Sequence, residues 1–245
     1  MALLEVDRLS KKFFEYAALD GVSLRLEPGE LLGIIGPNGS GKTTLFNCIS
    51  GVLSATSGSV RFQGRDITGL PADRVFAQGM ARTFQLIQVF PEMTVYENML
   101  MAAQERDGSL LGRLIQREPQ EVKDRARELL SYLGIDFMRE NLASNLSYGQ
   151  QKLLDFGMAL MSKPGLILLD EPLAGVNPTM IKNMVDHIRD LNSKGHTFIV
   201  IEHNMEAVMS LCRRIIVLSQ GQQIAEGTPD EVADNPLVLD AYFGK

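Results

Sequence analysis

The sequence contains no tryptophan, only two cysteines, and no hydrophobic run of the roughly 18 to 20 residues that a membrane span requires. Cys48 and Cys212 lie far apart, without the spacing of a zinc site or of a disulfide framework, which favours a reducing, cytosolic compartment. Residues 1–10 lack the basic region and apolar stretch of a signal peptide. We therefore expect a chain that does not enter a membrane by itself.

Basic residues are outnumbered by acidic ones. The chain has 24 Lys and Arg against 30 Asp and Glu, a formal net charge of -6. Broad attachment to nucleic acid or to anionic lipid relies on dense positive charge. The charge balance therefore predicts no nucleic-acid partner, and membrane association only through a protein partner. With 245 residues, 45% of them hydrophobic, the chain can form a globular core without metals or disulfides.

Hydrophobic patterning predicts a small antiparallel sheet near the N-terminus. Residues 3–6 and 22–26 have the pattern of short strands, and a segment rich in lysine and aromatic residues at 11–16 separates them. An apolar strand over 30–35 then leads into a glycine-rich loop. The helical spacing of residues 43–50 predicts a helix directly behind that loop.

The C-terminal half predicts a buried parallel sheet with crossover helices. Residues 166–169 and 198–201 are strongly apolar strands, and an amphipathic helix over 178–192 lies between them. Residues 94–133 have almost wholly helical spacing, including a mixed-charge helix over 113–128. This pattern indicates a helical insertion between two parts of an α/β core.

We therefore expect an α/β fold in a single domain over 1–245. Its catalytic core would comprise 1–90 and 160–245, and its helical subdomain about 91–159. Thr94 and Glu97 have the spacing of a capping box at the start of the helical part.

The glycine-rich loop carries a strong chemical signal. Residues 36–43, G-P-N-G-S-G-K-T, fit the phosphate-loop pattern between a strand and a helix. Its glycines let backbone N–H groups curl around phosphates, the helix adds its positive dipole end, and Lys42 adds a full charge. The Thr43 hydroxyl would bind Mg²⁺. The residues expected to bind the nucleotide here are Gly36, Pro37, Asn38, Gly39, Ser40, Gly41, Lys42, Thr43 and Thr44.

Two adjacent carboxylates end the apolar strand near residue 170. Asp170, at the strand end, would reach the Mg²⁺ shell. Glu171, one residue on, points elsewhere and can polarise a water for in-line attack on the γ-phosphorus. The phosphate loop and this acidic pair together predict a nucleoside triphosphatase.

A third motif, L-S-Y-G-Q-Q-K at 146–152, lies about twenty residues before the acidic strand. Ser147 is a good helix N-cap, and Gly149 permits close approach to the free N–H groups, which makes an anion site. This anion site lies apart from the phosphate loop and has no nucleotide of its own. It therefore implies contact with a nucleotide that is bound by another subunit. The motif resembles the signature sequence of ABC ATPases, and Ser147, Gly149 and Gln150 would contact the ATP of the partner subunit.

The whole chain is similar to the ABC nucleotide-binding domain. The resemblance implies a RecA-like parallel-sheet core, an N-terminal antiparallel β subdomain and an inserted α-helical subdomain, with ATP and Mg²⁺ as cofactors. It implies that Gln85 contacts Mg²⁺ and the attacking water, and that His203 contacts the γ-phosphate. Phe13 lies where the family places an aromatic ring on adenine, although Phe14 and Tyr16 compete for that role. Catalysis would thus fall to Glu171, His203, Gln85 and Lys42, and Mg²⁺ binding to Thr43, Gln85 and Asp170.

Two departures from common family spellings are informative. Tyr148 replaces a frequent glycine, and Asn177 replaces an aspartate. Both resemble the branch that serves branched-chain amino acid importers, as do the segments 81–85 and 90–98 and the tail from 226 to 244. ATPases of urea or other amide importers are similar, and a soluble ABC ATPase unrelated to transport is a further alternative.

That branch implies partners and a location. Partners would be transmembrane permease subunits, a second ABC ATPase that is a copy or a related chain, and, indirectly, a periplasmic or extracellular substrate-binding protein. The chain would lie on the cytoplasmic side of the inner membrane, bound through the permease. Candidate permease contacts in the helical insertion are Leu86, Phe90, Met93 and Tyr96, which could equally pack inside it.

Overall fold

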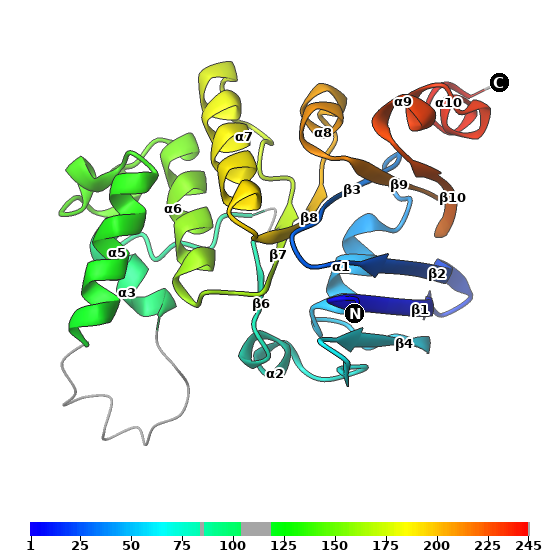
Figure 1. Cartoon of the computed structure of the whole chain (residues 1–245), viewed down its shortest axis with the longest axis horizontal. Coiled ribbons are helices and arrows are strands. Elements are labelled where there is room, and N and C mark those ends of the chain that lie inside the picture. The colour runs from blue at the N-terminus through cyan, green and yellow to red at the C-terminus, as the bar shows by residue number, and fades with distance from the viewer. Residues whose placement is uncertain (84–85, 104–118, 245) are drawn as a thin grey trace.

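A six-stranded sheet, ordered β10-β9-β3-β8-β7-β6, forms the centre of the computed structural model (Figure 1). The structure describes residues 1–83, 86–103 and 119–244. Neighbouring strands from β9 to β6 are parallel, and β10 pairs antiparallel with β9 at one edge. The strands are β3 (Leu31–Ile35), β6 (Met80–Arg82), β7 (Leu166–Asp170), β8 (Thr197–Ile201), β9 (Arg214–Ser219) and β10 (Gln222–Gly227).

A second, antiparallel sheet has the order β2-β1-β4-β5. Its strands are β1 (Leu4–Phe13), β2 (Tyr16–Leu26), β4 (Ser57–Phe62) and β5 (Arg65–Asp66). The antiparallel sheet is confirmed, but the expected strand limits are wrong. Residues 11–16 do not separate two short strands, because they form the far end of one long β1–β2 hairpin. Three register shifts along this pair disturb the alternation of apolar and polar residues on which the shorter prediction was based.

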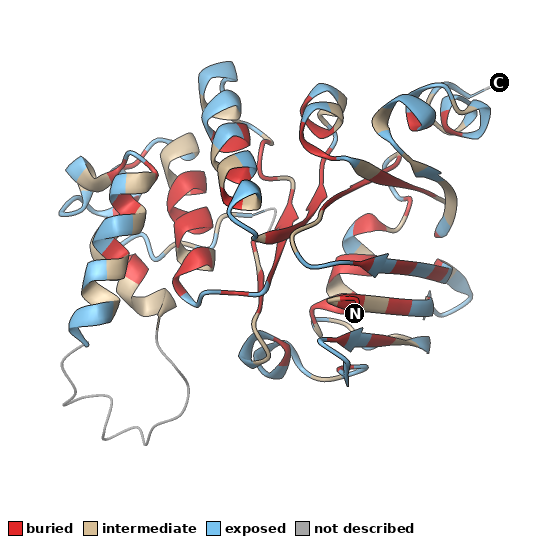
Figure 2. Cartoon of the chain, in the orientation of Figure 1, coloured by how far each residue is buried: buried red, intermediate tan, exposed pale blue. Residues whose placement is uncertain are grey.

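The two faces of the central sheet belong to two hydrophobic cores. Leu32 and Ile34 of β3 pack with the antiparallel sheet and with α1 (Lys42–Ile49). Leu31 and Ile35 pack on the opposite face, which is covered by α7 (Pro178–Ser193) and α8 (Met205–Leu211). Burial therefore runs through the whole length of the inner strands (Figure 2), and this explains their unbroken apolar sequences.

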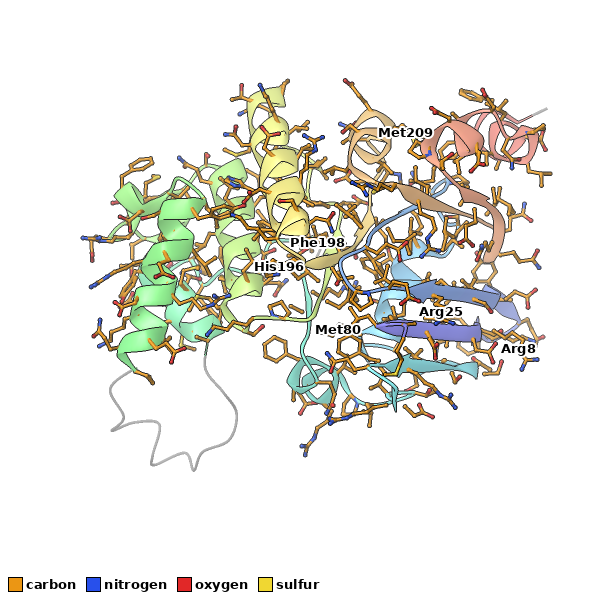
Figure 3. All side chains as sticks on the ribbon, viewed as in Figure 1. Arg8, Arg25, Met80, His196, Phe198 and Met209 are labelled. Carbon is orange, nitrogen blue, oxygen red and sulfur yellow. The ribbon has the colours of Figure 1, made fainter. Side chains whose placement is uncertain are left out.

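Side chains fill the space on both sides of this sheet. Phe198 of β8 lies at the foot of α7, near His196, and Met80 of β6 belongs to the core shared with the antiparallel sheet (Figure 3). Three further short helices complete the core part of the chain: α2 (Ala72–Ala77), α9 (Pro229–Ala233) and α10 (Pro236–Phe243). The α/β class expected from the sequence is confirmed.

Within the described residues, three helices gather at one end of the molecule (Figure 1): α3 (Val95–Ala102), α5 (Gln120–Tyr132) and α6 (Tyr148–Met161). Short 3₁₀ turns at Asp136–Met138 and Ala143–Asn145 connect α5 to α6. The Thr94 and Glu97 capping box is confirmed, since each side chain accepts a hydrogen bond from the other residue's backbone N–H. The expected helix over 113–128 is present from Gln120 onward, with Pro119 as its N-cap, and residues 113–118 lie outside the described part.

The Tyr132 hydroxyl joins this helical group to the core, because it donates to the Asp190 carboxylate of α7 at 2.7 Å. None of the helices in the described residues combines the length and the apolar character that crossing a bilayer would need.

Candidate functional site

The glycine-rich loop connects β3 to α1, and two of its glycines are required by its shape. Gly36 has φ +151°, and a Cβ there would lie 2.1 Å from the carbonyl oxygen of Leu218. Gly41, the N-cap of α1, has φ +103°, a conformation that other residues rarely adopt. The buried side chains of Leu45 and Phe46 fix α1 against the core behind the loop. The loop is therefore held rigidly at both ends.

Lys42 places its ammonium inside this loop. Its Nζ donates to the carbonyl oxygens of Gly36 at 2.8 Å and Pro37 at 3.0 Å. The residue is only 5% exposed, and burial lowers the pKa of Lys42, although the nearby charges of Glu171 and Asp170 oppose this shift. Thr43 is exposed beside it, at the start of α1. The arrangement supplies a positive charge, a helix N-terminus and a hydroxyl at one point.

Glu171 and His203 form a close pair at the carboxyl ends of β7 and β8. Nε2 of His203 lies 2.9 Å from Oε1 of Glu171. The backbone N–H of Glu171 donates to the carbonyl of Ile201 at 2.9 Å, and Glu171 itself has φ +51°. This left-handed conformation is unusual for glutamate and breaks the extended backbone directly after the last residue of β7. The pair is partly exposed, so water can reach the carboxylate.

Asp170 is 1% exposed, and one of its carboxylate oxygens accepts no hydrogen bond from any described residue. Its Oδ2 accepts a hydrogen bond from Nη2 of Arg82 at 2.9 Å, whereas Oδ1 is buried without a hydrogen-bond partner among the described residues. Burial raises the pKa of Asp170, opposed by the hydrogen bond and charge of Arg82. An unsatisfied buried carboxylate oxygen near the phosphate loop fits a Mg²⁺ site, because Mg²⁺ prefers oxygen ligands.

Sequence reasoning did not identify Glu202, which organises the loops around the Glu171 and His203 pair. Glu202 is 3% exposed, and burial raises its pKa against three backbone hydrogen bonds that lower it. Its Oε1 accepts from the N–H of Leu173 at 2.7 Å, and its Oε2 accepts from the N–H of His203 at 3.0 Å. One carboxylate therefore fixes both the loop after Glu171 and the loop that carries His203. The sequence signal that could have identified Glu202 is its position as a charged residue directly after the buried strand β8.

Lys152 and Arg82 also lie at the site without having been predicted. Lys152, buried on α6, donates from Nζ to the backbone carbonyl of Glu171 at 3.1 Å. Burial lowers the pKa of Lys152, against the opposing charges of Asp155, Glu202 and others. Arg82 ends β6, directly before the segment that contains Gln85. Gln85 itself lies outside the described residues.

The signature segment forms the start of α6, as expected. Ser147 caps the helix: its Oγ accepts from the N–H of Gln150, and the Gln150 side chain accepts from the N–H of Ser147. A Cβ on Gly149 would lie 3.0 Å from the Met180 side chain, and the Tyr148 ring covers Gly175. Across the described ranges, no hydrogen bond or ion pair joins this segment to the phosphate loop.

The aromatic candidates cluster at the tip of the β1–β2 hairpin. Phe13, Phe14 and Tyr16 are all exposed, Phe14 completely. The Lys11 ammonium lies 5.1 Å from the centroid of the Phe13 ring. Farther along β2, the carbonyl of Ala18 lies against Gly41, so the hairpin adjoins the phosphate loop. The choice among the three rings stays a prediction.

The apolar segment behind residue 85 is partly exposed. Leu86 and Phe90 are exposed at 77% and 47%, whereas Met93 and Tyr96 are half-buried. Asn98, wholly buried, donates from Nδ2 to the Phe90 carbonyl at 3.0 Å and accepts from its N–H at 2.7 Å. Hydrogen bonds to Asn98 thus fix the segment at Phe90. Of its four candidate contact side chains, those of Leu86 and Phe90 are exposed to solvent.

Comparison with known proteins identifies close relatives of this arrangement. Residues 19–174 match the ABC transporter family, and residues 222–245 match the family described as branched-chain amino acid ATP-binding cassette transporter. The chain is 39% identical, over 99% of its own length and 98% of the relative's, to the high-affinity branched-chain amino acid transport ATP-binding protein LivG of Salmonella typhimurium.

Two solved structures are similar to this one over all or most of its length. The ADP conformation of an ATP-binding cassette of an ABC transporter covers 100% of both chains with a TM-score of 0.89 and 38% identity. A dimeric post-hydrolysis cassette bound to ADP and Pi covers 92% of this chain and 98% of its own, with a TM-score of 0.79 and 25% identity.

Proposed function

Because the chain belongs to the ABC transporter family of ATP-hydrolysing cassettes, we propose that it is the motor subunit of an importer for branched-chain amino acids. The substrate assignment is supported by the match of the C-terminal residues 222–245 to the branched-chain cassette family and by the LivG relative. Urea or another amide is the alternative cargo, since an ATPase subunit does not touch what is transported.

One observation carries the proposed chemistry: Lys42, Asp170, Glu171 and His203 lie together at the carboxyl ends of three parallel strands. Lys42 binds the β- and γ-phosphates, and the Glu171 carboxylate orients the attacking water and takes its proton. His203, 2.9 Å from Glu171, holds that carboxylate in place and faces the γ-phosphate. These donors stabilise the negative charge that spreads over the transferred phosphoryl group.

Mg²⁺ belongs to this proposal through the chain's oxygen atoms. The Thr43 hydroxyl and the unsatisfied Oδ1 of Asp170 would hold the ion, with Gln85 added by family resemblance. When bound, Mg²⁺ neutralises part of the charge that develops on the phosphates.

The proposed working unit contains two cassettes head to tail. Ser147, Gly149 and Gln150 of one cassette contact the ATP held by the partner's phosphate loop, so that ATP joins the two. The dimeric relative and the exposed, capped start of α6 support this arrangement. Asn177 caps α7 by accepting from the N–H of Met180 at 3.0 Å, and it lies in the loop that would face the second cassette. That cassette is a copy or a related chain.

Coupling to transport would run through the exposed side chains of Leu86 and Phe90, which suit a short helix of a permease subunit. Met93 and Tyr96, half-buried, would complete the contact. The chain would then lie on the cytoplasmic side of the membrane and receive cargo signals indirectly from an external substrate-binding protein.

The ATPase proposal is tested by Glu171→Gln, with Glu206→Gln on the exposed start of α8 as the control. Glu171→Gln should lower turnover at least about 100-fold, since a general base contributes 10²- to 10⁴-fold, and should stabilise an ATP-bound dimer. ATP hydrolysis and sedimentation are measured for both variants. Normal turnover in Glu171→Gln would remove this residue as the base.

The transport proposal is tested by isolating the chain from detergent-solubilised native membranes and reconstituting the retained proteins in vesicles. Polytopic membrane proteins and a second ATPase should be retained, and ATP should drive uptake of leucine rather than urea. Soluble partners alone would contradict the transport function, and uptake of urea alone would contradict the proposed cargo.

A further inference from the structure

We propose that Arg82 is a positioning residue that aims Asp170 at Mg²⁺ and ties it to the helix that begins at the phosphate loop. The inference rests on the proposed Mg²⁺ role of Asp170. It concerns a residue outside the phosphate loop, the acidic pair and the signature segment.

The Arg82 guanidinium joins two parts of the site. Nη2 donates to Oδ2 of Asp170 at 2.9 Å. Nη1 donates to Oδ1 of Asn47 at 2.7 Å and to Oγ of Ser50 at 2.9 Å, near the end of α1. The side chains of Arg82 and Asp170 are 6% and 2% exposed, so the contact is shielded from water. A planar guanidinium is suited to fixing several acceptors at set angles.

The surroundings keep this guanidinium in one orientation. Arg82 is paired with Leu168 in the β6–β7 ladder, two residues before Asp170. Its guanidinium carbon lies 5.6 Å from the centroid of the Phe46 ring on α1. Ser50, one of its acceptors, itself donates to the carbonyl of Phe46 at 2.7 Å. The arginine is therefore held by a strand on one side and by α1 on the other.

This arrangement leaves the two Asp170 oxygens with different tasks. Oδ2 is occupied by Arg82, and Oδ1 is buried with no hydrogen-bond partner among the described residues. With Oδ2 fixed, the carboxylate cannot rotate to exchange its oxygens, so Oδ1 is the one presented to a cation. Groups that orient a metal ligand in this way commonly change metal affinity by about 10- to 100-fold when removed.

The contact also sets the distance between the two proposed ligands of Mg²⁺. Thr43 lies in the first turn of α1, and Asn47 and Ser50 lie at its other end. Arg82 binds that end of α1 and Asp170 at once. Movement of α1 relative to β7 would break the hydrogen bonds of Arg82. Because these bonds oppose that movement, the oxygens of Thr43 and Asp170 keep a fixed separation.

The test measures metal binding rather than turnover. Mn²⁺ is titrated into the protein with a non-hydrolysable ATP analogue, and free Mn²⁺ is followed by electron paramagnetic resonance. The affinity for the same analogue is also measured in EDTA. The variants are Arg82→Met and Arg82→Lys, and the control is Arg65→Met, which removes an exposed arginine hydrogen-bonded to Gln78.

Arg82→Met should weaken Mn²⁺ binding by about 10-fold or more and leave metal-free analogue binding within about 2-fold. Arg82→Lys should recover part of the loss, because lysine restores the positive charge but not the planar set of guanidinium N–H donors. Arg65→Met should bind Mn²⁺ as tightly as the wild type. Unchanged Mn²⁺ affinity in Arg82→Met would overturn the inference. An equal loss of metal-free binding would overturn it too, since that indicates general damage to the site.

A second variant covers the case in which Arg82→Met does not fold. Replacing Asn47 and Ser50 together by alanine keeps the Arg82 contact with Asp170 but releases it from α1. Mn²⁺ affinity should fall about 5-fold, the equivalent of about one net hydrogen bond, and an unchanged value would overturn the link to α1. If the wild type binds the analogue with no dependence on metal, the Mg²⁺ role in the proposed function fails instead.

Discussion

Asp155 gives the chain a measurable dependence of stability on pH. This residue of α6 is 8% exposed and lies among Thr83, Phe156, Leu169 and Met184. Burial raises the pKa of its carboxyl to about 6, although the backbone N–H of Gln88 and the Lys152 charge act in the opposite direction. The buried carboxylate is therefore less favourable in the folded chain than in water.

The sign and size follow from this pKa. Between the ordinary value of 3.8 and about 6, the folded chain binds more protons at Asp155 than the unfolded chain. Raising the pH through this window therefore lowers the free energy of unfolding, and the full loss is reached above the folded pKa. The rise in the pKa of Asp155 from 3.8 to about 6 corresponds to a loss of about 3 kcal/mol in the free energy of unfolding. About 2 kcal/mol of this loss falls between pH 4.5 and 7.5.

The perturbation is Asp155→Asn, which keeps the shape of the side chain and removes the charge. Urea unfolding of both proteins is measured at four pH values from 4.5 to 7.5, and the wild-type free energy is subtracted from that of the variant. Other titrating groups are common to both and cancel. The difference should rise by about 2 kcal/mol over this range.

A matched variant, Asp230→Asn on the exposed start of α9, controls for the loss of one carboxylate at the surface. The reasoning is refuted if the Asp155→Asn difference is flat with pH, or if Asp230→Asn gives a rise of the same size.

Two further predictions concern the phosphate loop and the signature segment. Ser147→Arg should leave ATP binding by the single chain intact and reduce turnover at least about tenfold, because the longer side chain would block the surface proposed to face a second cassette. It should also cost about 1 kcal/mol through loss of the cap. ATP binding, hydrolysis and urea unfolding check both parts, and unchanged turnover would contradict the shared site. Gly36→Ala should lower the free energy of unfolding by at least about 3 kcal/mol, since its Cβ would lie 2.1 Å from the backbone oxygen of Leu218; thermal unfolding near the wild-type temperature would contradict this.

Features set by neighbouring residues were predictable from the sequence. The caps formed by Thr94 with Glu97, and by Ser147 with Gln150, involve side chains and N–H groups three positions apart, so their geometry follows from the local pattern. The inner strands were predictable because burial on both faces leaves a continuous apolar run. The phosphate loop belongs to the same group, since its glycines and its lysine all fall within the short stretch 36–42.

Features that depend on distant partners were not predictable in this way. Arg82 acquires its place from Asp170, 88 residues later, and from Asn47, 35 residues earlier. Glu202 binds the N–H of Leu173, 29 residues before it. Nothing in the local spacing of either residue reports these contacts. The length of the β1–β2 hairpin was missed for a different reason, because its register shifts break the alternation that identifies a strand.

The hydrogen bonds of Lys42 determine which ligands can engage the loop. Its ammonium already donates to the carbonyls of Gly36 and Pro37, so a ligand must offer better acceptors before the lysine turns toward it. Phosphate oxygens meet this condition, because charge-assisted hydrogen bonds are about twice as strong as neutral ones. A nucleoside without phosphates has nothing to exchange with these carbonyls, however well its base stacks. We therefore expect discrimination at this end of the proposed site to depend on ligand charge, and base recognition to vary independently of it.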